Sequence, residues 1–258
     1  MTNRDGSPIW YELMTDAPDA AQAFYPPVTG WTFDTPPAGM ERDYRTFTAP
    51  DGEGVGGVFP TGMPATWAVY FGVADVDAAA ARVRELGGQV HMGPQDIPGV
   101  GRFAFVADPQ GATFYLMRGD TNLDSTAFAP MKAGHCSWNE LVTSNQDAAM
   151  AFYGALFGWT KAGAMPMGEM GEYTFIQHGD AMIGAVMTTP QTGAAPFWNF
   201  AFTVPDIDSA KAAVEAGGGT LRHGPVELPG DQGDWMIQIN DPQGAKVMLT
   251  GKRQSAAM

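Results

Sequence analysis

The sequence has little cysteine, few basic residues and no long apolar runs. These shortages argue against disulfides, nucleic-acid binding and membrane spans, respectively. Among its 258 residues Cys136 is the single cysteine, so an internal disulfide is excluded and a reducing, cytoplasmic location is expected. Lysine and arginine number 14 against 28 acidic residues. Binding to a phosphate backbone needs clustered basic residues, so we expect no nucleic-acid partner. No apolar run reaches the ~18 residues of a membrane span, so we expect no membrane partner.

What the sequence does contain is a repeat. Apolar residues make up 45% of the chain, which is enough to bury a sizeable core. Residues 10–33 align without a gap with residues 138–161, and thirteen of these twenty-four positions are identical. The likeness continues downstream, from 74–99 to 205–230 and from 103–119 to 235–251. A repeat of this period and extent indicates two tandem copies of one domain. We predict domain 1 at 1–120, a linker at 121–134 and domain 2 at 135–258.

Each copy divides again, into two units with the order β-α-β-β-β. A strand at 10–15 precedes a helix that we expect to begin after an N-cap at Asp16. We expect Pro26 and Pro27 to end that helix early, and the second copy, which lacks them, to have a longer helix. The next unit begins with a strand at 67–73 and a helix capped by Asp75. Further strands are expected at 31–34, 44–49, 55–59, 89–91, 103–107 and 112–117. The fold class is therefore α+β, with four such units in two pairs.

Three motifs, two of them repeated, resemble the vicinal oxygen chelate superfamily, which includes glyoxalases, bleomycin-resistance proteins and extradiol dioxygenases. They are D-A-A-x-A-F-Y at 19–25 and 147–153, F-G-W at 157–159, and D-P-x-G at 108–111 and 241–244. The resemblance covers nearly the whole chain and is greatest to two-domain, hydroxylase-like members. It implies that each copy is a glyoxalase-like domain, in which two units form a U-shaped, eight-stranded mixed sheet around a cleft.

The same resemblance implies four metal-ligand positions in each copy, and the residues at these positions are unsuitable. The family's ligands are histidine, glutamine and glutamate, whereas a tryptophan begins the first strand of each copy here. Indole does not coordinate divalent metals, and a phenol or thioether seldom does. The fourth strands, VGGVF and IGAVM, contain no carboxylate. We therefore expect no metal and no cofactor. The residues at the vacated positions are Trp10, Ala68 and Tyr115 in the first copy and Trp138, Asn199 and Met248 in the second.

One carboxylate remains on the first strand of each copy, Glu12 and Glu140, two residues after the tryptophan. Strand side chains alternate, so Trp10 and Glu12 share a face, which the resemblance turns toward the cleft. A carboxylate beside an indole is a candidate ligand contact or general base. The other interpretation is a structural glutamate bonded to backbone donors or to a tyrosine at the sheet seam. Both interpretations stay open at the level of sequence.

Together these residues predict an aromatic-lined cleft that binds a small molecule. We expect the first copy to be more open, because Ala68 leaves room that Asn199 would fill. The four histidines do not align between the copies, so we interpret them as surface or capping residues. The predicted ligand-binding residues are Trp10, Glu12, Ala68, Tyr115, Trp138, Glu140, Asn199 and Met248, and the candidate catalytic residues are Glu12 and Glu140.

Three functions are compatible with this sequence. The favoured one is a metal-free protein that binds a small-molecule ligand. The second is an enzyme, either a lyase or isomerase that uses Glu12 or Glu140 or a dioxygenase-like protein. The third is a non-catalytic structural module. A monomer or a homodimer is expected.

Overall fold

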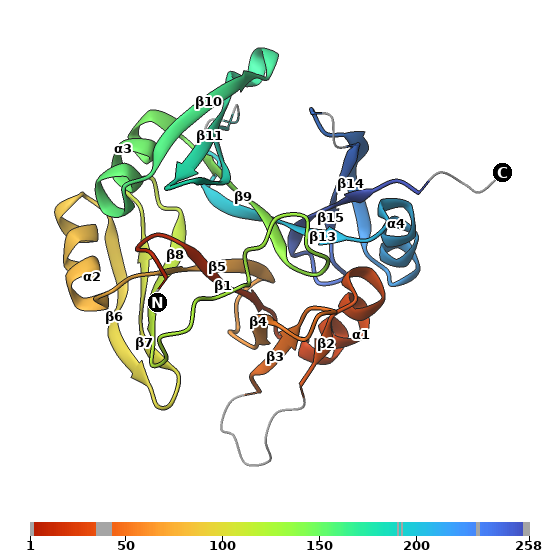
Figure 1. Ribbon diagram of the computed structural model, residues 1–258, viewed down its shortest axis with the longest axis horizontal. Helices are drawn as coiled ribbons and strands as arrows, with labels where there is room; N and C mark the ends of the chain where they lie inside the picture. Colours follow the sequence, from red (N-terminus) through yellow and green to blue (C-terminus); the bar gives the residue numbers. More distant parts are fainter. Residues whose placement is uncertain (1–2, 35–42, 190, 192, 231–232, 255–258) are drawn as a thin grey trace. The chain divides into compact units, whose positions relative to one another are not determined.

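The chain forms two mixed eight-stranded sheets, one from each copy of the repeat (Figure 1). The computed structural model describes residues 3–34, 43–189, 191, 193–230 and 233–254. The strand orders are β2-β3-β4-β1-β5-β8-β7-β6 and β10-β11-β12-β9-β13-β16-β15-β14. The two orders are identical once β9 to β16 are matched one by one to β1 to β8. The predicted α+β duplication of four β-α-β-β-β units is confirmed.

The first copy contains two helices within these described ranges. Its elements are β1 (Pro8–Met14), α1 (Pro18–Thr29), β2 (Thr32–Phe33), β3 (Arg45–Thr48), β4 (Gly54–Phe59), β5 (Thr66–Gly72), α2 (Val76–Glu85), β6 (Gln89–Ile97), β7 (Gly101–Ala107) and β8 (Thr113–Gly119). The second copy repeats this order and adds a short 3-10 turn. Its elements are β9 (Cys136–Thr143), α3 (Gln146–Phe157), β10 (Thr160–Pro166), η1 (Gly168–Met170), β11 (Glu172–His178), β12 (Ala181–Thr188), β13 (Phe197–Val204), α4 (Ile207–Ala216), β14 (Thr220–Glu227), β15 (Asp234–Asn240) and β16 (Lys246–Lys252).

The first strand of each β-α-β-β-β unit runs parallel to its fourth. β1 pairs with β4 and β9 with β12 in this way, and the remaining strands of each unit pair antiparallel. The register places Glu12 opposite Gly57 and Glu140 opposite Ala185. The two glutamates therefore occupy equivalent positions on equivalent strand pairs.

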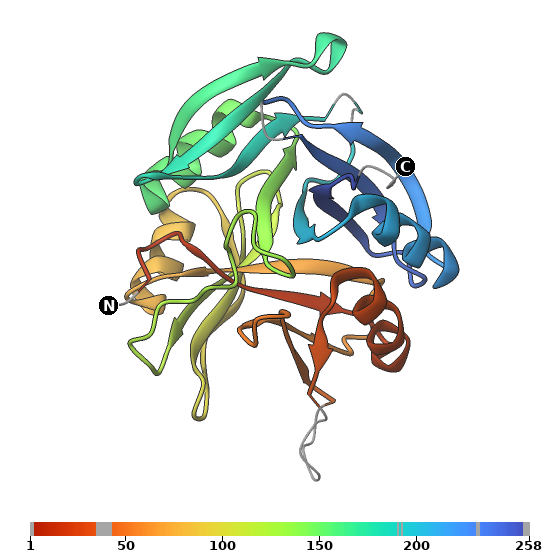
Figure 2. The same cartoon turned by 45° about the vertical axis from the view of Figure 1, so that its right-hand side comes forward.

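The described chain clusters into two compact units, and each unit takes one half of each copy. Unit 1 comprises Met1–Trp10, Ala68–Ser125 and Trp138–Asn199; unit 2 comprises Tyr11–Trp67, Thr126–Ser137 and Phe200–Met258. In unit 2, α1 packs against α4, which lies beside it in both ribbon views (Figure 2). In unit 1, α2 packs against α3. The halves of one copy thus pack their helices against halves of the other copy.

The same buried contact joins the two halves in each unit. In unit 2, Tyr25 Oη donates to Asp241 Oδ2 at 3.0 Å, and in unit 1, Tyr153 Oη donates to Asp108 Oδ2 at 3.2 Å. Both aspartates also accept backbone N–H groups within their own D-P-x-G turns. Burial raises the pKa of all four side chains, which keeps both tyrosines in the neutral, donating form. The F-Y and D-P-x-G motifs are therefore partners across the repeat.

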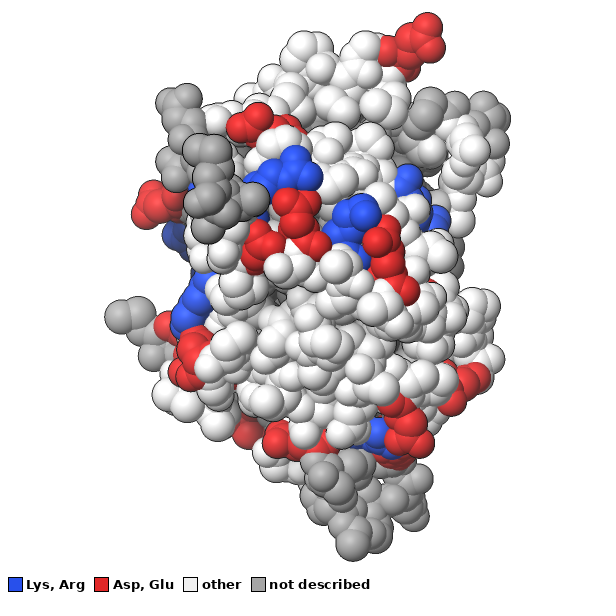
Figure 3. All heavy atoms as spheres, turned by 90° about the vertical axis from the view of Figure 1, so that its right-hand side faces the viewer, with Lys and Arg blue, Asp and Glu red and all other residues white. Residues whose placement is uncertain are grey.

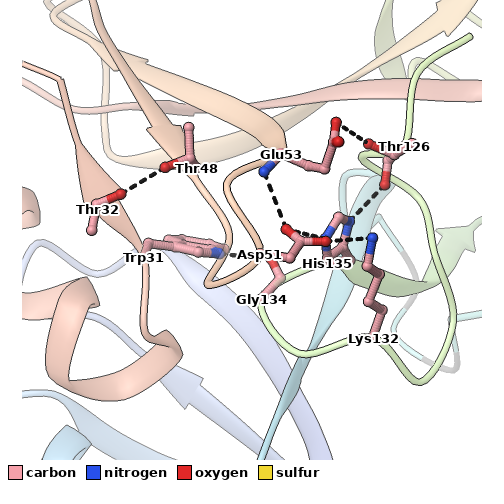
Figure 4. A network of polar contacts seen from close by, with 9 residues as sticks. All are labelled: Trp31, Thr32, Thr48, Asp51, Glu53, Thr126, Lys132, Gly134 and His135. Atoms are coloured by element: carbon pink, nitrogen blue, oxygen red, sulfur yellow. Dashed lines mark hydrogen bonds and ion pairs between the residues drawn. The ribbon is translucent and has the colours of Figure 1, made fainter.

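A second pair of equivalent contacts anchors the segment that precedes the first strand of each copy. In unit 1, Trp159 Nε1 donates to Gly6 O at 3.2 Å. In unit 2, Trp31 Nε1 donates to Gly134 O at 2.6 Å, as Figure 4 shows. Both glycines have positive φ, 88° and 81°. A Cβ at Gly134 would lie 2.5 Å from Pro50, so glycine is required there for close approach as well as for φ.

The prediction that Pro26 and Pro27 end the first helix is wrong. α1 continues through both prolines to Thr29, and α1 and α3 have the same length of 12 residues. The last turn is held by its packing: Val28 and Thr29 are buried, and Thr29 Oγ1 donates to Tyr25 O at 2.9 Å. Tertiary contacts of this kind outweigh the low helix propensity of proline near a helix end.

The predicted N-cap of this helix is also wrong, whereas that of the next helix is confirmed. The N-cap of α1 is Ala17, and Pro18 occupies its first turn. Asp16 instead accepts the backbone N–H groups of Thr61 and Gly62, which fixes the segment after β4. Asp75 caps α2 through the N–H of Ala78, as predicted.

Charges of both signs lie close together on the surface. Figure 3 shows one face on which acidic and basic side chains gather beside each other around a broad uncharged area. In unit 2, Arg253 pairs with Asp208 at 2.6 Å and Lys211 with Glu215 at 2.7 Å. Among the helices of the described chain, we find none that is both long and apolar enough to span a membrane.

Candidate functional site

The first strand of each copy turns alternate side chains to opposite faces. On β1, Tyr11 and Leu13 are fully buried among core residues, and Tyr11 packs against Phe200. The intervening Glu12 is 4% exposed, and Trp10 is half-buried. The equivalent strand β9 places Trp138 and Glu140 on the other side from Leu141. The sequence therefore sets a tryptophan and a glutamate together on one strand face in each copy.

A tyrosine contacts the first of these glutamates in unit 2. Tyr44, directly before β3, donates its hydroxyl to Glu12 Oε1 at 2.7 Å. The tyrosine reaches the glutamate across Gly57, which pairs with Glu12 in the sheet. A Cβ on Gly57 would lie 2.5 Å from Tyr44 Cζ, too close for any real contact. Gly57 is therefore what allows the phenol ring to lie over the strand.

The equivalent glutamate in unit 1 takes part in a longer chain of hydrogen bonds. Tyr173, on β11, donates its hydroxyl to Glu140 Oε2 at 2.9 Å. The same hydroxyl oxygen accepts the indole N–H of Trp138 at 2.7 Å. Burial, followed by the charge of Glu140, raises the pKa of Tyr173 well above its usual value. The phenol is thus a neutral donor that fixes the orientation of a carboxylate 8% exposed to solvent.

Asn199 adds a third side chain to this cluster. It lies on β13, is 3% exposed, and directs its amide nitrogen at Glu140 Oε1, 3.5 Å away. Its carbonyl oxygen, Oδ1, is buried without a hydrogen-bond partner in the described part of the chain. We call Trp138, Glu140, Tyr173 and Asn199 the Glu140 cluster. Three of its members are residues that the sequence predicted for the site, and the structure brings them together.

The remaining predicted residues lie in other surroundings. Tyr115, in unit 1, is 9% exposed and stacks on Tyr70 with ring centroids 4.3 Å apart and an interplanar angle of 6°. Phe105 continues the stack on the other side at 4.7 Å. Ala68 is buried on β5, and Met248, in unit 2, is buried on β16 opposite Ala201. Tyr115 is therefore part of an aromatic stack.

The residues at the implied metal-ligand positions do not fit a metal ion. Trp138 uses its N–H as a donor to Tyr173, and an indole has no lone pair to offer in return. Tyr115 packs as a ring in a stack. Across the described ranges, we find no group of three or more His, Cys, Asp or Glu side chains placed to hold a metal. The glutamates that remain, Glu12 and Glu140, are each bonded to a tyrosine.

Sequence reasoning missed a second polar cluster, in unit 2, around the turn after β3 (Figure 4). Asp51 there contacts Lys132 and lies 3.2 Å from His135 Nε2. The other ring nitrogen of His135 contacts Thr126 O at 2.6 Å. These contacts hold residues 126–135 against the first copy. No motif marks them in the sequence.

The interpretation of all four histidines as surface or capping residues is wrong for two of them. His135 is fully buried, and His178 is 7% exposed with Nε2 3.0 Å from Asp5 O. Both lie where a segment preceding the first strand of a copy meets a turn of the other copy. His91 and His223 are exposed, as expected. The buried pair has a structural role in each unit.

Comparison with known families and proteins gives a consistent result. The family model of the Glyoxalase/Bleomycin resistance protein/Dioxygenase superfamily matches residues 9–116 and 132–249. The "Putative glyoxylase CFP32" of Mycobacterium tuberculosis is 34% identical over 248 residues, which cover 94% of this chain and 93% of that protein. The "Anthracycline biosynthesis protein DnrV" of Streptomyces peucetius is 34% identical over 270 residues, with 96% and 94% covered.

Solved structures share the fold at low sequence identity. A variant of homoprotocatechuate 2,3-dioxygenase from B. fuscum superimposes with a TM-score of 0.69 at 16% identity, covering 97% of this chain and 72% of that one. The Mn(II)-bound glyoxalase from Novosphingobium aromaticivorans gives a TM-score of 0.64 at 18% identity, with 97% and 82% covered. At these identities the likeness establishes the fold alone.

Proposed function

Because the chain belongs to the Glyoxalase/Bleomycin resistance protein/Dioxygenase superfamily, yet carries aromatic and neutral residues where that fold would hold a metal, we propose that it binds a small molecule without a metal. The binding residues are those of the two strand faces that carry Trp10 with Glu12 and Trp138 with Glu140. A metal-free site of this kind recognises its ligand by aromatic contact and by a few fixed polar groups.

The observation that carries this proposal is the contact between Trp138 and Tyr173. The indole stands at an implied metal-ligand position and donates its N–H to the hydroxyl that holds Glu140. A metal at that position would need a lone pair from the side chain, whereas the indole supplies apolar surface and a donor. The position therefore favours an organic ligand over an ion.

The glutamates would supply the polar part of the recognition. Each carboxylate is nearly buried, with one oxygen accepting a tyrosine hydroxyl. A carboxylate that is fixed in this way loses little conformational freedom when a ligand donor reaches it, so the cost of binding is reduced. Burial raises the pKa of Tyr173, so this phenol stays neutral and donates to Glu140.

A ligand screen on the intact protein with matched glutamate variants tests the proposal. We expect members of a varied compound library to raise the melting temperature equally with and without a chelator. Binding should be abolished in Glu12→Gln or Glu140→Gln, or in both, while the melting temperature without ligand changes little.

A purely structural glutamate gives a different pattern. Glu→Gln would then cost ~1 kcal/mol of stability and Glu→Ala ~1–3 kcal/mol, because the partners are stranded, and binding would be unaffected. Ligand binding that survives both Glu→Gln variants would contradict the proposed role of these carboxylates. No binding by any compound would contradict the proposal as a whole and favour the non-catalytic structural module.

The second candidate function is an enzyme, a lyase, isomerase or dioxygenase-like protein. The names of the relatives, one a glyoxylase and one an anthracycline biosynthesis protein, favour it. In a metal-free reaction the carboxylate of Glu12 or Glu140 would accept a proton from the bound molecule, and its neighbouring tyrosine would hold it in place. Conversion of a bound compound by the wild-type chain but not by Glu12→Gln or Glu140→Gln would identify this case. Our proposal places the protein in the cytoplasm, as a monomer or homodimer with no nucleic-acid or membrane partner.

A further inference from the structure

The Glu140 cluster contains a buried acceptor that its neighbours leave unsatisfied. The amide nitrogen of Asn199 faces Glu140 Oε1, and turning the amide over would set its oxygen against a carboxylate oxygen. The orientation is therefore fixed, and it leaves Asn199 Oδ1 sealed from solvent without a donor among the described residues. Buried acceptors without a donor are costly and rare in folded proteins. This one points to a donor from outside the chain.

The fold itself does not require this unsatisfied oxygen. The first copy has Ala68 at the equivalent position, which carries no polar atom. Other buried polar atoms without partners occur at equivalent positions of both copies, as in the pair Gln110 with Gln243. That repeated case belongs to the common architecture. Thr143, Thr203 and Asn240 also carry such an atom in the second copy alone, and of these four residues Asn199 is the one that contacts Glu140. A reason for its unsatisfied oxygen is therefore sought in the Glu140 cluster.

The surroundings of Asn199 Oδ1 define what donor would suit it. Glu140 lies beside it and provides a second acceptor. A carboxylate there would also attract a cationic donor. Trp138 and Tyr173 are the half-buried members of the cluster, so they form its outward side. Trp138 is the larger apolar surface there, and it packs near Phe175 with ring centroids 6.1 Å apart. The cluster thus combines two acceptors with an aromatic wall.

We propose that Asn199 Oδ1 and the Glu140 carboxylate receive the hydrogen-bond-donating head group, an amine or a hydroxyl, of a small aromatic ligand whose body packs against Trp138. Because the oxygen is buried, the head group reaches it only when a neighbouring side chain moves. This inference rests on the proposed function and deepens it, since it names the ligand class and places the site in the second copy. The expectation from the sequence that the first copy is more open concerns only the space that Ala68 leaves. It stays a prediction.

Three matched probes test the head group: benzylamine, benzyl alcohol and benzyltrimethylammonium, a cation without a donor. Each is titrated into the full chain and followed by ¹H–¹⁵N spectra, with the indole N–H signal of Trp138 assigned through Trp138→Phe. We expect one or both donor probes to bind and to shift that signal, and the donor-free cation to bind at least fivefold more weakly. The tighter of the two donor probes tells whether an amine or a hydroxyl is preferred.

Asn199→Ala, which copies Ala68, and Asn199→Leu, which keeps the volume, should each weaken the donor probes about five- to tenfold. Asn122→Ala, at an exposed asparagine, is the control and should leave affinity unchanged. Asn199→Ala removes the unsatisfied oxygen but also the long amide contact to Glu140 Oε1, so its melting temperature should change little. A purely structural asparagine would instead lower the melting temperature and leave probe affinity unchanged.

The inference is wrong if the donor probes bind the Asn199 variants as tightly as the wild type, or if benzyltrimethylammonium binds as tightly as the tighter of the two donor probes. If library compounds bind the chain but no donor probe does, this inference fails while the proposed function stands. If neither the library nor the probes bind, the proposed function fails with it.

Discussion

The two copies hold the same carboxylate in different surroundings. Glu12 is contacted by Tyr44, which lies over Gly57. Glu140 is contacted by Tyr173, which also accepts the Trp138 N–H, and by Asn199. The glutamate–tyrosine contact is what the copies share, and the neighbours are what differ. The shared contact therefore belongs to the architecture, and a difference in function between the copies must come from the neighbours.

The largest effect is expected where the copies are most alike, at the buried aspartates. Asp108→Ala and Asp241→Ala each strand two backbone N–H groups and a tyrosine hydroxyl. We expect each to cost about 3 kcal/mol or more in urea unfolding, and by similar amounts. Asp→Asn, which keeps an oxygen for the backbone groups, is the matched control and should cost less. A cost confined to one unit would show that the two units are not built alike.

The next effect separates the copies at the strand opposite each glutamate. Gly57→Ala places a Cβ against the Tyr44 ring, so we expect a loss of about 1–3 kcal/mol by overpacking. The second copy already has alanine there, and Ala185→Gly should cost only ~0.5–1 kcal/mol through the added freedom of the unfolded chain. Urea unfolding measures both. If Gly57→Ala is neutral, Tyr44 does not lie over this strand as described.

Removing the two hydroxyls sharpens the comparison further. Tyr44→Phe deletes a donor to Glu12, which should cost about 1 kcal/mol. Tyr173→Phe deletes a donor to Glu140 and also the acceptor of the Trp138 N–H, so we expect about twice that loss. Thermal or urea unfolding of both variants gives the ratio. Equal losses would mean that the contact with Trp138 adds nothing to stability.

The smallest effect is a pH dependence that belongs to unit 1. Burial lowers the pKa of His178 below its ordinary value of 6.5. As the pH falls through 6.5, the unfolded chain therefore binds a proton before the folded chain does, and the free energy of unfolding decreases. His178→Gln, which keeps a donor for Asp5 O, should reduce the slope of stability between pH 7 and pH 5. Identical slopes in wild type and variant would count against this assignment.

The sequence predicted the architecture well because its periodic patterns are local and are written twice. The strand that contains Trp10 and the helix cap at Asp75 depend on residues close in sequence, so the sequence alone predicted both. The prolines of α1 misled because burial of Val28 and Thr29, which holds the last turn, is a tertiary property. The pairing of Tyr25 with Asp241 was also out of reach, since neither motif tells which copy it will pack against.

The candidate site was predicted only in part. The sequence placed Trp138 and Glu140 on one face and named a tyrosine as a possible partner of the glutamate, because alternation and burial require both. It could not identify Tyr173 as that tyrosine, since Tyr173 lies 33 residues away. Nor could it foresee that Asn199 would reach Glu140 and leave its own oxygen without a donor. Such contacts depend on how strands pair and how far side chains extend.

The most direct test of the account is elemental analysis of protein purified without chelators, combined with ligand titration before and after chelator treatment. We predict no stoichiometric transition metal and the same affinity for a bound compound in both preparations. Stoichiometric Mn, Fe, Ni or Zn that is lost on mutation of Trp138, Glu140 or Asn199, together with binding that disappears on chelation and returns with the metal, would contradict the central claim.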